Sequence, residues 1–181
     1  ARVELEKLRS TSGGGTGGST SSSTGGAGGT GGGAECPTSV KPEPGTVITS
    51  RGAVTGAQAG TTWVFKGIPY AAPPVGDLRW KRPTPHACWD DAKPAVEFGP
   101  KCMQIDANGA VVGAEDCLTI NVWTPADATA DKPVPVLFFI HGGGNVQGAS
   151  SVDAQGTVIY DGQAMSERGH VAVVTLNYRL G

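Results

Sequence analysis

Two strand-sized apolar runs, at residues 134–140 and 171–176, constrain the fold more than any other feature of this sequence. Runs that are apolar nearly throughout are typical of strands buried on both faces of an α/β sheet. Residues 164–168 lie between the two runs and favour a short helix that ends at Gly169. A strand, a helix and a second strand in this order predict a right-handed crossover with parallel pairing.

A further strand is predicted at residues 118–123, where apolar and polar residues alternate until Pro125 ends the pattern. The link from this strand to the run at 134–140 is too short to hold a crossover helix, so we expect these two strands to be antiparallel. Three shorter β-prone runs lie upstream, at 46–50, 53–55 and 61–66. Turn-forming residues separate them, which predicts small hairpins or a meander.

The segment at residues 67–100, between the short upstream runs and the strand at 118–123, is rich in proline. Proline cannot donate to a sheet ladder, so we expect an ordered but irregular path here. Trp80 and Trp89 are expected to anchor the path by burying their large side chains.

The first 35 residues differ in composition from the rest of the chain. Positions 13–33 hold twelve of the 29 glycines, and residues 11–33 contain only Gly, Ser, Thr and one Ala. A tract with so little apolar surface cannot offset the entropy that is lost on ordering. We therefore expect a short charged leader at 1–10, a disordered linker at 11–35 and a folded domain at 36–181. The linker is interpreted as a spacer toward a cell-surface anchor, and the alternative is a low-complexity insertion without a role.

Charge and composition argue against several classes of function. The formal net charge is −2, so no basic surface for nucleic acid is expected. No run of about 18 apolar residues occurs, so no membrane span is expected. The four cysteines form no Cys-x-x-Cys pair and the three histidines lie far apart, so we expect no metal site and no cofactor. The even cysteine count favours an oxidising compartment, that is, an extracellular, periplasmic or surface-tethered protein.

The run at 134–140 leads directly into His141, Gly142, Gly143 and Gly144. Glycine weakens strands, so three in succession indicate a backbone conformation closed to other residues and a close approach by a ligand. Two adjacent N–H groups aimed at one point form a small positive concavity. Such a pair stabilises the oxygen that becomes negative when an ester carbonyl is attacked, and one donor contributes about 3 kcal/mol. The alternative is a tight glycine turn at a strand end.

The loop belongs to a series of six segments: FKGIPYA at 65–71, PPVG at 73–76, LRW at 78–80, EDCLTINVW at 115–123, FIHGGG at 139–144 and LNYRLG at 176–181. From about residue 47 onward, the chain resembles the type-B carboxylesterase and cholinesterase-like family of α/β-hydrolases. The resemblance implies the N-terminal part of an α/β-hydrolase fold, with a β-meander followed by the first strands of a mixed, mostly parallel sheet, incomplete in this chain. It also implies an enzyme that acts on small-molecule carboxylic esters.

In this family the second and third glycines of the loop supply two N–H groups of the oxyanion hole. The resemblance thus assigns these donors to Gly143 and Gly144, with Gly142 supporting the loop. Catalysis in this fold also needs a serine in a Gly-x-Ser-x-Gly turn, which the sequence lacks. We expect that serine, with its histidine and its Glu or Asp, to follow Gly181. The chain alone is then an inactive N-terminal fragment of a serine ester hydrolase.

Two residue pairs gain structural roles from the resemblance, namely the disulfide Cys102–Cys117 and the ion pair Arg79–Glu115. By elimination, the two cysteines that remain, Cys36 and Cys88, would then form a second disulfide. The alternatives are unpaired buried thiols and two solvated charges. A disulfide that closes the short 102–117 loop stabilises the fold by roughly 3 kcal/mol.

Two departures from the family pattern bear on the substrate. The residue after the glycines is usually aromatic in the family, whereas here it is Asn145, and the 102–117 loop is short and contains no tryptophan. A cation–π site for a quaternary ammonium group therefore has no support, and we interpret the chain as part of a general carboxylesterase. The alternative is a catalytically inactive cholinesterase-like binding or adhesion domain, which the intact glycines disfavour.

The remaining histidines and the apolar run carry two further expectations. His86 and His170 are expected at the surface, and no histidine in the chain is expected to be the catalytic base. Without a following strand, residues 136–140 are expected to form an unpaired apolar edge. Such an edge promotes aggregation, so the chain alone is expected to be poorly soluble.

Overall fold

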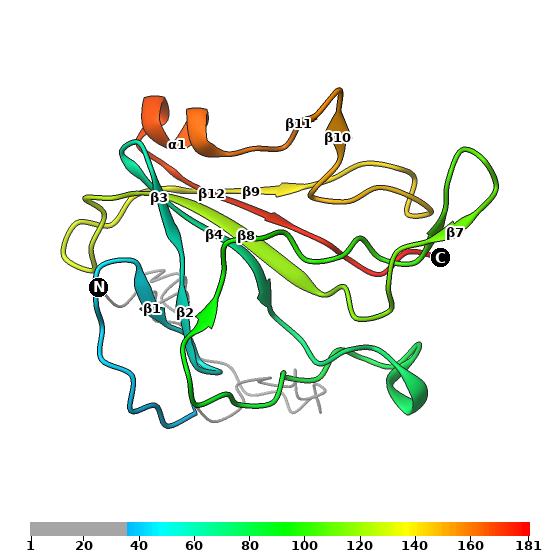
Figure 1. Cartoon of the computed structure of the whole chain (residues 1–181), viewed down its shortest axis with the longest axis horizontal. Coiled ribbons are helices and arrows are strands. Elements are labelled where there is room, and N and C mark those ends of the chain that lie inside the picture. Colours follow the sequence, from blue (N-terminus) through cyan, green and yellow to red (C-terminus); the bar gives the residue numbers. More distant parts are fainter. Residues whose placement is uncertain (1–35) are drawn as a thin grey trace, which may run out of the picture.

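The computed structural model describes residues 36–181, which form two larger sheets and two small ribbons (Figure 1). The predicted leader at 1–10 and linker at 11–35 lie outside the described residues. The main sheet has five strands in the order β3-β4-β8-β12-β9. These strands are β3 (Ala57–Ala59), β4 (Thr62–Pro69), β8 (Thr119–Pro125), β12 (Ala172–Leu176) and β9 (Val136–Ile140).

The predicted unit of strand, helix and strand is confirmed. Helix α1 (Gln163–Gly169) connects β9 to β12, and these two strands pair in parallel from Ala172 opposite Val136 to Leu176 opposite Ile140. The other neighbours, β3 with β4, β4 with β8 and β8 with β12, are antiparallel. The sheet is therefore mixed, and β8 runs opposite to β9, as expected. The two strands are not neighbours, however, because β12 lies between them.

The predicted small hairpins are present. Strands β1 (Thr46–Ile48) and β2 (Ala53–Thr55) form an antiparallel hairpin, and β5 (Lys93–Pro94) adds a parallel strand beside β2. Strands β3 and β4 form a second hairpin in the main sheet. Two short ribbons complete the fold: β6 (Gln104–Ile105) with β7 (Val111–Val112), and β10 (Asp153–Ala154) with β11 (Thr157–Val158).

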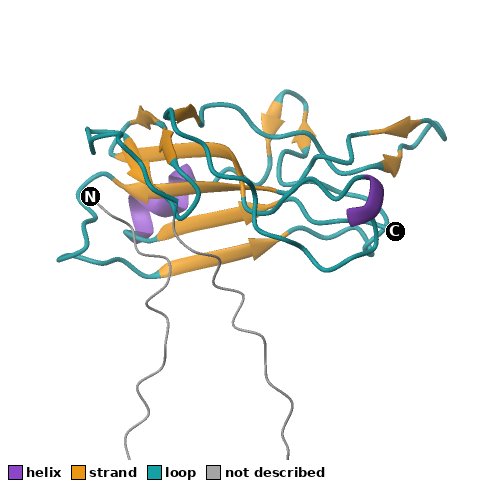
Figure 2. Ribbon diagram, turned by 90° about the horizontal axis from the view of Figure 1, so that it is seen from below, coloured by secondary structure: helices purple, strands orange, loops and turns teal. Residues whose placement is uncertain are grey.

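The two faces of the main sheet pack against different elements (Figures 1 and 2). Phe65 and Val122 face the three-stranded sheet β1-β2-β5, which we call the small sheet. There they join a core with Trp89. On the opposite face, α1 packs against β4, β8 and β12. Here Trp123 is fully buried and Gly162, just before the helix, lies against it and against Val173. The alternation of neighbouring strand residues between the two faces produces this division.

Trp89 is buried as predicted, but the prediction for Trp80 is wrong. The Trp89 indole packs under β2 and donates a hydrogen bond of 2.7 Å to the Ala53 carbonyl. Trp80 follows the 3-10 turn η1 (Gly76–Leu78) and is 78 % exposed. The Arg79 guanidinium carbon lies 6.0 Å from the centroid of its ring, and Trp80 belongs to none of the core clusters among the described residues. A large side chain is buried only where a complementary surface is present, and composition alone does not show that surface.

The two apolar runs differ in burial. Four of the five residues of β12 are buried, as expected, whereas every residue of β9 is exposed, from 37 % at Phe139 to 61 % at Ile140. The prediction that β9 is buried on both faces is therefore wrong for this chain, because β9 lies at the edge of the sheet and α1 covers the inner strands. The expectation of an exposed apolar edge at 136–140 is confirmed.

The end of α1 differs slightly from the prediction. The helix includes Gly169, and the residue in the left-handed conformation is His170, with φ 50° and ψ 49°. Glycine is favoured there because it lacks a Cβ, but a single non-glycine residue also adopts this conformation at moderate cost. No helix among residues 36–181 has the length and apolar character needed to cross a membrane.

Candidate oxyanion loop

The glycine loop begins where β9 ends. His141 is buried, and residues 142–147 are exposed. Gly143 and Gly144 have φ of 120° and 63°, and Asn145 continues the turn with φ 64°. A Cβ on Gly143 would overlap the carbonyl oxygen of Gln147, so only glycine fits that position. We call residues 142–148 the glycine loop.

Four N–H groups of the glycine loop, those of residues 142–145, find no acceptor within residues 36–181, and the pair that the family resemblance singles out is among them. The turn closes on the Gly143 carbonyl, which accepts the N–H groups of Val146 and Gln147, each at 3.2 Å. The N–H groups of Gly143 and Gly144 donate to no acceptor among residues 36–181. Because the loop is exposed, both donors remain open to a ligand or to water. A backbone of this kind attracts an oxyanion.

The His141 side chain serves the structure of the loop. Its imidazole stacks on the Tyr178 ring at 4.3 Å between centroids, and its Nδ1 lies 2.9 Å from the Gly142 carbonyl oxygen. The Tyr178 hydroxyl donates a hydrogen bond of 2.8 Å to the His141 carbonyl. These contacts hold the entry to the loop against the segment that follows β12.

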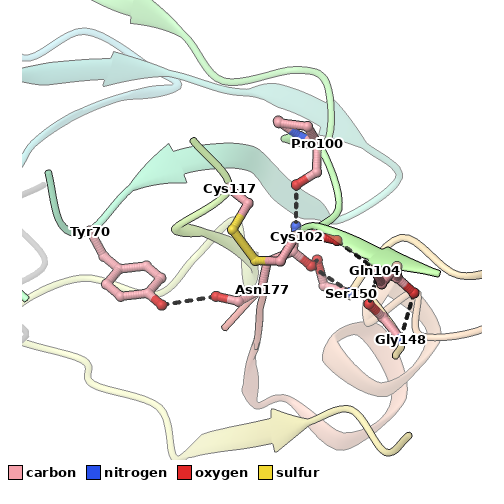
Figure 3. The surroundings of a disulfide bond; sticks show 8 residues. All are labelled: Tyr70, Pro100, Cys102, Gln104, Cys117, Gly148, Ser150 and Asn177. Atoms are coloured by element: carbon pink, nitrogen blue, oxygen red, sulfur yellow. Dashed lines mark hydrogen bonds between the residues drawn. A yellow bond between two sulfur atoms is a disulfide. The ribbon is translucent and has the colours of Figure 1, made fainter. Parts of the chain in front are cut away.

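A buried polar network lies beneath the far end of the loop (Figure 3). Both the N–H and the hydroxyl of Ser150 donate to Asn177 Oδ1, at 2.8 and 3.0 Å, and Asn177 Nδ2 donates to the Pro100 carbonyl. Asn121, at the centre of β8, donates from Nδ2 to Ser150 Oγ and to Thr175 Oγ1, each at 3.0 Å. Each of these polar side chains is almost fully buried and satisfied, so the network ties the loop to two strands of the sheet.

Tyr70 joins the same network from the proline-rich segment. Its hydroxyl donates a hydrogen bond of 2.9 Å to the Asn177 carbonyl (Figure 3). Burial raises the pKa of the Tyr70 phenol above its ordinary value of 10.0, and the nearby Arg179 guanidinium opposes part of that rise. The phenol is therefore protonated at neutral pH and acts as a donor.

The two expected disulfides and the expected ion pair are formed in the structure. Cys36 bonds to Cys88, beside the small sheet, and Cys102 bonds to Cys117, just before β8. Arg79 Nη2 lies 3.7 Å from Glu115 Oε1, and both side chains are substantially exposed. An exposed pair of this kind contributes little to stability.

The other two histidines lie away from the glycine loop. His86 is partly exposed and meets the edge of Trp89, whereas His170 is exposed at the end of α1. His170 Nδ1 is 3.8 Å from Asp127, whose pKa is lowered chiefly by its hydrogen bond to Lys132. Residues 36–181 contain no cluster of three His, Cys, Asp or Glu side chains suited to a metal ion.

Several residues that build this site were not predicted from the sequence. They are Gln104, Asn121, Ser150, Asn177 and Tyr178. The sequence holds one sign that Asn121 is buried and hydrogen-bonded: it is polar, while the residues directly before and after it on the strand are apolar. Buried polar side chains need partners, and the partners here come from segments 27 to 77 residues away along the chain.

The comparisons with known proteins agree with this geometry. A model of the carboxylesterase family matches residues 43–181. Carboxylesterase 1D of Rattus norvegicus is 41 % identical over 132 residues, which cover 65 % of this chain and 22 % of that protein. Para-nitrobenzyl esterase of Bacillus subtilis is 40 % identical over 141 residues, which cover 75 % of this chain and 27 % of that protein.

Solved structures give the same result. A PNB esterase superposes with a TM-score of 0.67 at 41 % identity, covering 77 % of this chain and 28 % of that one. The carboxylesterase EST55 of Geobacillus stearothermophilus gives 0.66 at 40 % identity, covering 76 % and 26 %. The chain thus spans about a quarter of the length of these relatives and matches an incomplete part of their α/β-hydrolase fold. Because the family model covers well over half of the chain, the chain belongs to the carboxylesterase family.

Proposed function

We propose that this chain forms the oxyanion-binding part of a serine carboxylic ester hydrolase. The observation that carries the proposal is the pair of N–H groups of Gly143 and Gly144, which have no acceptor among residues 36–181 and lie in an exposed loop with a fixed base. When a nucleophile attacks an ester, the carbonyl oxygen becomes an alkoxide. The two N–H groups donate to that alkoxide more strongly than to the ground-state carbonyl, which lowers the barrier.

The attacking group comes from residues outside these 181, since the sequence contains no Gly-x-Ser-x-Gly turn. In the proposed reaction a serine hydroxyl attacks the ester carbon while a histidine takes the hydroxyl proton. The alcohol then leaves with that proton, and an acyl-serine remains. Water attacks the acyl-serine through the same histidine, which restores the serine and releases the acid. A Glu or Asp orients the histidine throughout.

The proposed substrate is a small-molecule carboxylic ester. Relatives of this chain include a fumonisin B1 esterase and a para-nitrobenzyl esterase. In this chain the residue that follows the glycines is Asn145, which is polar and exposed. We further propose an extracellular, periplasmic or surface-tethered location, because both disulfides suit an oxidising compartment and residues 11–35 suit a spacer.

The test joins residues 36–181 to the segment of the Bacillus subtilis para-nitrobenzyl esterase that follows its matched region. We call this protein the joined chain. It is expected to hydrolyse p-nitrophenyl acetate with a burst of nitrophenol, because acylation precedes deacylation. A fluorophosphonate probe is expected to label its serine.

The 181-residue chain alone is the control and is expected to show no turnover and no labelling. A joined chain that is folded by circular dichroism yet neither hydrolyses the ester nor reacts with the probe would contradict the proposal. That result favours the inactive binding domain instead.

A further inference from the structure

We infer that Gln104 is a positioning residue for the oxyanion donors: its side-chain amide clamps the glycine loop to the disulfide-bonded ribbon β6–β7. The inference rests on the proposed function for its catalytic meaning. The clamp itself is a structural statement and is tested without ester turnover. Gln104 lies outside every motif that carried the family resemblance.

The clamp is a two-way hydrogen-bonded pair (Figure 3). The Gly148 N–H donates to Gln104 Oε1 at 2.9 Å, and Gln104 Nε2 donates back to the Gly148 carbonyl at 2.9 Å. The same Nε2 also donates to the Cys102 carbonyl at 2.9 Å. Both donors and the acceptor of the amide are therefore used, so the half-buried side chain has one favoured orientation.

Gly148 transmits this constraint to the start of the glycine loop. Its φ is 116°, and a Cβ there would lie 2.5 Å from both the Gly142 carbonyl oxygen and His141 Nδ1. The backbone of Gly148 thus packs directly on the Gly142 carbonyl. That carbonyl and the N–H of Gly143 belong to one planar peptide unit. Whatever fixes the Gly142 oxygen also fixes the direction in which the Gly143 N–H points.

The other end of the clamp is anchored on a rigid element. Gln104 begins β6, which pairs with β7, and Cys102 two residues earlier is bonded to Cys117. Cys102 also forms an isolated bridge with Ala114. A positioning group works best on a braced element, because its own motion is then small. The disulfide therefore restrains the glycine loop through the hydrogen bonds of Gln104.

The test uses amide hydrogen exchange in the 181-residue chain, followed at residue resolution by mass spectrometry at dilute concentration. Gln104→Met keeps the length of the side chain and removes all three hydrogen bonds. We expect the Gly148 amide, and the Val146 and Gln147 amides that close the turn on Gly143, to exchange about tenfold faster or more. Amides in the β8–β12 pairing are expected to be unchanged.

Gln104→Glu adds a titration that a merely structural role would not produce. Near pH 7 the carboxylate cannot donate and faces the Gly148 and Cys102 carbonyl oxygens, so protection is lost as in Gln104→Met. Near pH 4 the protonated carboxyl accepts from the Gly148 N–H and donates to its carbonyl, which restores the pair. Because both carbonyls disfavour the charged form, the restoration is expected to begin above the ordinary glutamate pKa of about 4.3.

Gln58→Met is the matched control, since Gln58 is an exposed glutamine on β3 whose amide makes only a local hydrogen bond to Gly60. It is expected to leave the glycine loop unchanged. The inference is overturned if Gln104→Met leaves the Gly148, Val146 and Gln147 amides as slow as in the unchanged chain. It is also overturned if exchange accelerates equally in β8 and β12, or if Gln104→Glu shows no recovery at low pH. Failure of the joined chain to hydrolyse esters leaves these readouts intact, so the two failures are distinguishable.

Discussion

At the scale of single residues, the conformation of the glycine loop depends on side chains that lie outside the loop. Asn177 links Ser150, Pro100 and Tyr70, and Tyr178 covers His141. Such buried polar groups are costly when one partner is lost, because the other is left without a hydrogen bond. We therefore expect conservative substitutions of these residues to alter the conformation of the glycine loop, although they lie well away from Gly143.

Tyr70→Phe tests one of these links. It removes the hydroxyl that donates to the Asn177 carbonyl, and we expect the free energy of unfolding at pH 7 to fall by about 1 kcal/mol. The Tyr70 pKa is raised in the folded protein, so the unfolded state loses its proton first as the pH rises above 10.0. The contribution of the Tyr70 phenol to the free energy of unfolding is thus fully present below that pH and is lost as the pH rises above it. Urea unfolding at several alkaline pH values should show a steeper decline for the unchanged chain than for Tyr70→Phe, and equal slopes would contradict the account.

At the scale of elements, the short ribbon β6–β7 is more than a surface loop. The disulfide Cys102–Cys117 closes it at its base, and its first strand carries Gln104. A pair of strands this short would not hold its shape alone. The covalent link therefore substitutes for the strand length that would otherwise hold Gln104 in place.

Replacing both cysteines tests that statement. The double variant Cys102→Ser and Cys117→Ser is expected to lose about 3 kcal/mol of unfolding free energy, since the two residues are 15 positions apart. The measurement is urea unfolding under non-reducing conditions. A loss no larger than that of an exposed control, Ser39→Ala, would show that the ribbon keeps its shape without the disulfide.

The main elements were predictable because their signals are local. The apolar runs located β9 and β12, the alternating run located β8, and the glycines marked the end of β9. The order of strands was not predictable, because nothing within the sequence of β8 or β9 states that β12 inserts between them. The Gln104 clamp was not predictable either, because its partner Gly148 lies 44 residues away. A glutamine in a short loop is usually expected to be solvent-exposed. Trp80 shows the converse error, in which size alone suggested burial.

At the scale of the whole molecule, the most unusual surface feature of the described residues is the exposed edge strand β9. Its five residues are apolar, and all are exposed at the edge of the sheet. An edge of this length and character offers unpaired backbone groups and apolar side chains to any other chain. The 181-residue chain is therefore expected to self-associate as its concentration rises.

A charge placed on β9 should reduce that association. Phe138 is 55 % exposed, and Phe138→Lys adds charge to the centre of the edge. Sedimentation velocity should show large species for the unchanged chain and a shift toward monomer for Phe138→Lys. Val111→Lys, at a residue on β7 that is 67 % exposed, is expected to have little effect. An unchanged chain that stays monomeric at high concentration would contradict this account.

The most direct test of the oxyanion role is the turnover number of the joined chain with Gly144→Val. Gly144 has φ 63° with open space around it, and a β-branched residue leaves that conformation and turns the N–H away. Gly156→Val is the matched control, with φ 81°, equally open space and a position in the β10–β11 turn. We predict that Gly144→Val lowers kcat on the order of 100-fold with little change in KM, whereas Gly156→Val retains kcat. Equal kcat values for the two variants would contradict the assignment of the Gly144 N–H to the oxyanion.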